Sequence, residues 1–107
     1  MSTSETELII LKKLEKNPNL TQREMAKELN LSLGKTNYLI HSLIDKGWLK
    51  LRNFNNSNNK FGYVYLLTAD GIINKTKLTK NFLVRKTEEF EKLKKEIEKL
   101  ENELSNL

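Results

Sequence analysis

Side chains that can bond a nucleic acid are concentrated between Ser32 and Lys60. This stretch holds five Lys or Arg residues against one acid, Asp45, so its net charge is +4. Lys and Asn side chains can bond base edges in the major groove of DNA, and Lys, Arg and Asn can bond phosphate oxygens. The pattern favours contact with a polyanion, and the candidate residues are Ser32, Leu33, Lys35, Asn37, Tyr38, His41, Lys50, Arg52, Asn56, Asn58 and Lys60.

The first six candidates belong to a helix that we expect to run from a Ser32 cap to about Lys46. Its apolar positions recur at helical spacing, which turns the candidate side chains toward solvent. Asn37 can bond an adenine through both amide atoms, and Lys35 can reach a guanine edge or a phosphate. The alternative is an ordinary solvated helix face, and for a lone His41 solvation is the commoner outcome. The expected buried residues are Thr36, Leu39, Ile40, Leu43 and Ile44.

A β-hairpin is expected directly after this helix. Residues 48–52 and 63–67 have strand-like alternation, and a polar, Asn-rich segment separates them. The remaining five candidates lie on this hairpin, where Lys, Arg and Asn suit phosphate or minor-groove contact. The abundance of Asn at the tip equally fits the codon usage of an AT-rich genome. Trp48 is expected to anchor the hairpin in the core instead of stacking on a base.

Two shorter helices are expected before the basic stretch. Ser4 with Glu7 and Thr21 with Glu24 have the spacing of capping boxes, and Pro18 separates the two helices. In the first, Leu8, Leu11 and Leu14 with Ile9 are the expected buried stripe. The second and third helices, joined by a short turn, make a helix-turn-helix, and the hairpin makes it winged. We therefore expect a mainly α fold with a small β-hairpin wing, occupying residues 4–70.

The segment 71–107 is expected to continue as one long helix after a Thr68 cap. Its second half has a heptad repeat, with Lys86 as the one polar residue among the seam positions. Such a stripe needs a partner, and a parallel homodimer is favoured over an antiparallel one. Packing on its own domain or on another protein are the alternatives. The expected dimerisation residues are Leu83, Phe90, Leu93, Ile97, Leu100 and Leu104.

The composition excludes several classes of function. The 107 residues include no Cys and one His, so we expect neither thiol catalysis nor a metal site, and no cofactor. No phosphate-binding glycine loop or nucleophile elbow occurs, so an enzyme is not expected. The polar start and the short apolar runs predict neither a signal peptide nor a membrane span, so a cytoplasmic location is expected. The net charge of +5 is compatible with a nucleic-acid partner.

Three segments within residues 6–72 resemble the winged helix-turn-helix of MarR-type transcriptional regulators. The resemblance implies a homodimeric regulator that binds double-stranded DNA. The full layout is similar to small regulators of this type associated with exopolysaccharide (EPS) gene clusters. Because little sequence precedes the first expected helix, the family's effector pocket is not carried over, and no small-molecule effector is identified. The segments are Leu20–Ala26 (LTQREMA), Leu43–Leu49 (LIDKGWL) and Tyr65–Gly71 (YLLTADG).

A second class of function fits the same elements. Winged folds also serve as scaffolds for protein contacts, and the heptad helix would then recruit a larger partner. Binding to a DNA duplex distinguishes the two hypotheses, because an interaction module need not bind any duplex.

Overall fold

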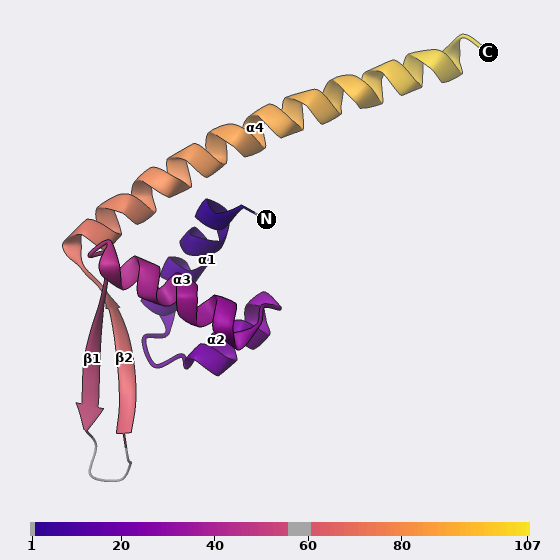
Figure 1. The fold of residues 1–107 in the computed structure, drawn as a ribbon. Coiled ribbons are helices and arrows are strands. Elements are labelled where there is room, and N and C mark those ends of the chain that lie inside the picture. Colours follow the sequence, from indigo (N-terminus) through magenta and orange to yellow (C-terminus); the bar gives the residue numbers. More distant parts are fainter. Residues whose placement is uncertain (1, 56–60) are drawn as a thin grey trace.

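The computed structural model describes residues 2–55 and 61–107 and confirms a mainly helical winged fold. Three helices precede an antiparallel hairpin, and one long helix follows it (Figure 1). The strands pair from Leu49 opposite Leu67 to Asn55 opposite Phe61. The elements are α1 (Thr3–Lys16), α2 (Gln22–Leu29), α3 (Leu33–Asp45), β1 (Leu49–Asn55), β2 (Phe61–Leu67) and α4 (Ala69–Ser105).

Each helix begins at a hydroxyl side chain that accepts a backbone N–H bond. Thr21 forms the expected capping box with Glu24, Ser32 caps α3, and Thr68 caps α4. The expected box at Ser4 is wrong, because Ser2 is the cap and accepts from the amide of Glu5 at 3.2 Å. Thr6 and Glu7 in this first part of α1 are both buried.

The core lies between α1, α2, α3 and the base of the wing. From α1 it takes Ile10, Leu11 and Leu14, so Ile10 and not Ile9 completes the stripe; Ile9 is half-buried. Fully burying an aliphatic side chain of this size stabilises the fold by about 1.5–3 kcal/mol. The α3 residues Thr36, Leu39, Ile40 and Leu43 are buried as expected, and Ile44 packs at the edge of the core.

The wing is fixed to the helices at its base. Leu49 and Tyr65 are buried, and the amide of Tyr65 donates to the carbonyl of Pro18 at 3.3 Å. Leu51, which the alternation of side chains along a strand puts on the same side as Leu49, is exposed, since only the base of the hairpin meets the core. Trp48 precedes β1 and packs against the core as a partly buried anchor.

A compact junction joins the wing to α4. Gly47 has a φ of 79°, the left-handed conformation that commonly follows the last residue of a helix. The amide of Thr68 donates to the carbonyl of Trp48 at 3.0 Å, and the Thr68 hydroxyl donates to the carbonyl of Gly47 at 2.5 Å. Gly71 lies directly over Trp48, where a Cβ would overlap the Trp48 carbonyl oxygen. The start of α4 is therefore clamped to the turn after α3.

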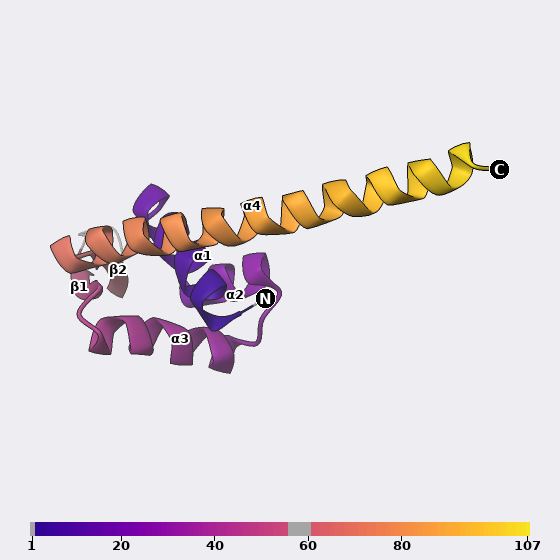
Figure 2. The same cartoon turned by 90° about the horizontal axis from the view of Figure 1, so that it is seen from above.

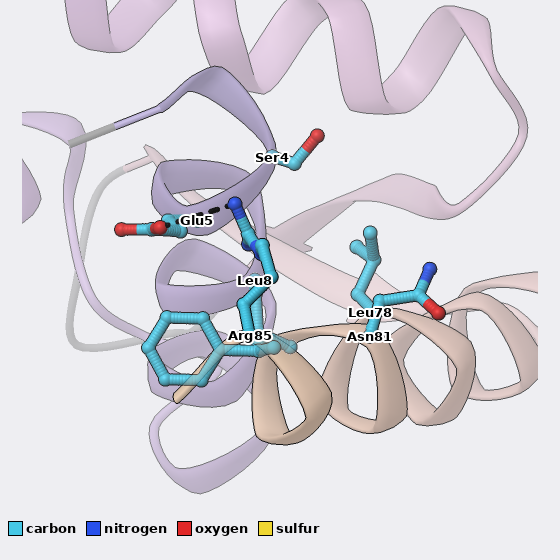
Figure 3. A pocket seen from close by; sticks show the side chains of 7 residues that line it. Ser4, Glu5, Leu8, Leu78, Asn81 and Arg85 are labelled. Carbon is cyan, nitrogen blue, oxygen red and sulfur yellow. Dashed lines mark ion pairs between the residues drawn. The ribbon is translucent and has the colours of Figure 1, made fainter. Parts of the chain in front are cut away.

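The first half of α4 lies along α1, and the second half projects away from the domain. In the view from above, α1 lies between α4 and α3 (Figure 2). Lys75 pairs with Glu15 at 2.6 Å. Farther along α4, Arg85 pairs with Glu5 at 3.3 Å beside a hollow of about 220 Å³ (Figure 3). Every residue from Leu83 to Leu107 is exposed, and the molecule reaches 72 Å along its longest axis. Among the described residues, no helix combines the length and apolar character that crossing a membrane requires.

Candidate nucleic-acid interface

The exposed side of α3 carries the candidate residues that the helical periodicity predicted. Leu33, Lys35, Asn37, Tyr38 and His41 are all exposed, opposite the buried row of the same helix. Tyr38 is 66% exposed, although tyrosine rings are usually at least half covered. An exposed mixture of cation, amide and aromatic groups on one helix face can bond phosphates, base edges and thymine methyl groups.

The first turn of α3 is held by its own side chains. The hydroxyl of Ser32 accepts from the amide of Lys35 at 3.0 Å, so this candidate residue is occupied as a helix cap. The Lys35 Nζ lies 5.5 Å from the centre of the Tyr38 ring, a cation–π distance. The first two turns of α3 therefore present a positive charge beside an aromatic ring, at the end of the helix that enters the groove in helix-turn-helix proteins.

Asn37 has a hydrogen-bond partner on another element. Its Nδ2 donates to Oε1 of Gln22 at 2.9 Å, and Nε2 of Gln22 donates to the hydroxyl of Tyr65 at 2.9 Å. No periodic or charge signal in the sequence indicates Gln22, which begins α2 beside its capping residue. This hydrogen-bond chain connects α3 to the wing through α2, and we call it the Asn37 relay.

The described part of the wing presents two of its five candidates. Lys50 and Arg52 are exposed on β1, which follows α3 and packs against it. The structure therefore places their positive charge on an element adjoining the candidate helix. The other three wing predictions, Asn56, Asn58 and Lys60, lie outside the described residues.

Lys46 contributes less free charge to the basic stretch than the sequence count implies. Its Nζ lies 2.6 Å from Oε2 of Glu7, whose side chain is only 7% exposed, and 4.8 Å from the Trp48 ring centre. The charge of Lys46 is therefore committed to holding the end of α3 against α1 and Trp48. The sequence does not indicate this pair, because 39 positions separate its members.

The predicted dimerisation residues form a separate exposed surface on α4. Their exposed fractions range from 48% for Ile97 to 71% for Leu104, so none of them packs on this chain's own domain. Phe90, Leu93 and Ile97 line one shallow apolar groove of about 280 Å³ on this surface. No cluster of three metal-ligating side chains occurs among residues 2–55 and 61–107.

Residues 3–50 match the family model described as winged helix-turn-helix DNA-binding. This match covers α1, α2, α3 and the first residues of β1, the elements that carry the exposed helix face. It defines the class of domain to which this geometry corresponds. No curated protein sequence matches the chain.

Among solved structures, the chain is similar to the zinc-dependent MarR family transcriptional regulator AdcR in its Zn(II)-bound state. The identity is 23% and the TM-score 0.50, over 82% of this chain and 59% of that chain. The chain therefore spans about three fifths of the AdcR chain, and the likeness is one of fold. A possible transcriptional regulator from Methanosarcina mazei Go1 is also similar, with 19% identity and a TM-score of 0.47, over 80% of this chain and 75% of that chain.

Proposed function

We propose that the chain is a transcriptional regulator that binds double-stranded DNA in a sequence-specific manner. The observation that carries the proposal is the exposed face of α3, with Lys35, Asn37 and Tyr38 together at the helix's N-terminal half. A helix of this kind fits the major groove, and the adjoining Lys50 and Arg52 supply phosphate contacts. The match of residues 3–50 to a DNA-binding family model supports the same conclusion.

Duplexes selected from a random pool provide the test of base reading. The double variant Lys35→Ala with Asn37→Ala should lose the preference for the selected sequence over a scrambled duplex, because the base-contacting groups are gone. Fluorescence anisotropy with both duplexes measures this preference. Lys99→Ala is the matched control, since it removes an exposed cation from the far half of α4. Equal losses on both duplexes would contradict the assignment of these residues to base reading.

The salt dependence of binding tests the wing. Arg52→Ala should weaken binding to every duplex and lower the slope of log K against log salt by about one unit, because one phosphate contact is lost. A change confined to one sequence would instead make Arg52 a base-reading residue. Titrations of the protein with each duplex at several salt concentrations distinguish a loss on every duplex from a loss on one sequence.

We also propose that the regulator is a homodimer joined through the second half of α4. An apolar stripe this regular is unstable in water unless a partner helix covers it, and two-fold operators are read by two-fold proteins. In a parallel pair, Glu89 of one helix lies beside Lys94 of the other, whereas an antiparallel pair brings the Glu residues of the same heptad position together. The parallel arrangement is therefore preferred, despite an unfavourable approach of Glu96 to Glu101.

Sedimentation of full-length variants tests the dimer. Ile97→Lys places a charge in the middle of the stripe and should convert the dimer to a monomer. Asn102→Lys introduces the same charge at an exposed position outside the stripe and should leave the dimer intact. An unchanged mass for Ile97→Lys would remove α4 as the dimer contact.

The resemblance to exopolysaccharide-associated regulators suggests the first target genes to examine. Binding to duplexes from upstream of such genes, compared with unrelated promoter fragments, tests this finer proposal. If the chain binds no duplex at moderate salt, the exposed stripe instead favours the second candidate function, a winged scaffold that recruits a partner protein through α4.

A further inference from the structure

The Asn37 relay joins a proposed base-reading residue to a buried point of the wing. It passes from the Asn37 amide on α3 to the Gln22 amide on α2, and from there to the Tyr65 hydroxyl on β2, through two hydrogen bonds of 2.9 Å each. The two outer members are exposed and buried respectively, and Gln22 lies half-buried between them. Three elements that are distant in sequence thus meet at one short hydrogen-bond chain.

The Tyr65 end of the relay is fixed in place. The Tyr65 residue is only 7% exposed, and its backbone amide donates to the carbonyl of Pro18. A buried ring on a strand held in this way allows its hydroxyl little freedom. Gln22 in turn uses both ends of its amide, Nε2 toward Tyr65 and Oε1 toward Asn37, so its orientation is tied to both neighbours.

The Asn37 end of the relay keeps the atoms that adenine recognition needs. Among the described residues, one Nδ2 hydrogen is used on Gln22, and the Asn37 amide makes no other hydrogen bond. Oδ1 and one Nδ2 hydrogen are therefore left for another partner, and an Asn amide oxygen and N–H are the acceptor and donor that match N6–H and N7 of adenine. An unrestrained Asn would lose rotamer freedom on binding, whereas a held amide has already lost much of it.

We infer that Gln22 and Tyr65 are positioning residues that hold the Asn37 amide for reading an adenine, so that a wing hydroxyl controls sequence preference without itself contacting DNA. This inference rests on the proposed DNA binding and deepens it. The contrasting role is structural, in which the same hydrogen bonds merely stabilise the fold and base preference does not depend on them.

Tyr65→Phe tests the effect of the Tyr65 hydroxyl on base preference, because it removes the hydroxyl and keeps the buried ring. The measured quantity is the ratio of Kd values for the preferred duplex and for duplexes changed at one base pair. At the pair where Asn37→Ala abolishes the preference, the unaltered protein should discriminate by about tenfold or more. Tyr65→Phe should lower that ratio by about threefold and leave the ratios at other pairs unchanged.

A double-variant cycle separates positioning from stability. If Tyr65 acts through Asn37, the loss caused by Tyr65→Phe should disappear when Asn37 is already alanine. Ser105→Ala, which removes a hydroxyl bonded to the Glu101 carbonyl at the end of α4, is the control and should leave every ratio unchanged. A loss of the same size with and without Asn37, or no loss at all, would overturn the relay while leaving DNA binding intact.

A measurement without DNA tests the relay independently of the function. The side-chain amide signals of Asn37 in an NMR spectrum of the free protein should shift in Tyr65→Phe and stay in place in Ser105→Ala. Unshifted Asn37 signals in Tyr65→Phe would overturn the inference whatever the protein binds. An unaltered chain that prefers no duplex sequence would overturn the proposed function, and this inference with it.

Discussion

The winged domain and the far half of α4 both carry regular apolar rows, yet only one of these rows is covered. In α1 and α3 the row is buried against neighbouring elements, whereas from Leu83 onward the row on α4 is exposed along its whole length. Helical periodicity identifies a face that needs burial, and it does not say which surface covers it. The difference separates the part of the chain that packs on itself from the part whose apolar row is exposed.

Gly71→Ala should cause the largest loss of stability, because it adds a methyl group at the junction between the winged domain and α4. The added Cβ would overlap the Trp48 carbonyl oxygen, which is backbone and has little room to move. We expect the free energy of unfolding to fall by about 4 kcal/mol or more. Urea unfolding followed by circular dichroism measures this change.

Gly34→Ala on α3 is the control for this prediction. No atom lies within 4 Å of the Cβ it would add, so stability should be unchanged or rise by up to about 1 kcal/mol. Equal losses in the two variants would mean that the close approach at Trp48 does not hold the junction together.

The second prediction compares one leucine from each region. Leu11→Ala should lower the free energy of unfolding by about 3 kcal/mol, because it leaves a cavity in a fully buried site. Leu104→Ala should not destabilise the winged domain and should weaken only self-association. Unfolding measured at a concentration where the chain is monomeric distinguishes the two variants. A loss for Leu104→Ala as large as for Leu11→Ala would show that the stripe is covered by its own domain.

The smallest expected effect concerns ion pairs with different burial. Lys46→Met should cost about 1–2 kcal/mol, because it leaves the buried Glu7 carboxylate without its partner while Lys46 itself is partly exposed. Lys13→Met breaks the pair with Glu28, in which both side chains are partly exposed, and should change stability by less than about 0.5 kcal/mol. Thermal unfolding of both variants tests whether burial determines how much an ion pair contributes to stability. Similar losses of stability in the two variants would contradict a role for burial.

The sequence predicted most of the local structure because local signals determine it. The Thr21, Ser32 and Thr68 caps and the left-handed Gly47 follow from residue type at a helix end. The capping box predicted at Ser4 is wrong because Ser2 offers an equivalent hydroxyl two residues earlier, and the Thr6 hydroxyl donates to the Ser2 carbonyl at 3.0 Å.

Contacts between distant residues could not be read from the sequence. Gln22 and Tyr65 are 43 positions apart, and no periodicity or charge pattern indicates that their side chains meet. The overlap that a Cβ on Gly71 would create depends on the path of the chain through the wing, which brings the start of α4 back to Trp48. The sequence alone shows only a glycine near the start of a helix. Exposure of the α3 candidates was predictable from one helical wheel, whereas the partner that holds Asn37 was not.

The projecting half of α4 is a lever. From Leu83, where exposure becomes continuous, to Ser105 it extends for about 33 Å at 1.5 Å per residue. A tilt of about 10° at Leu83 therefore displaces the far end by roughly 6 Å, about one helical turn. Small adjustments where α4 leaves the winged domain are thus magnified along its exposed apolar row.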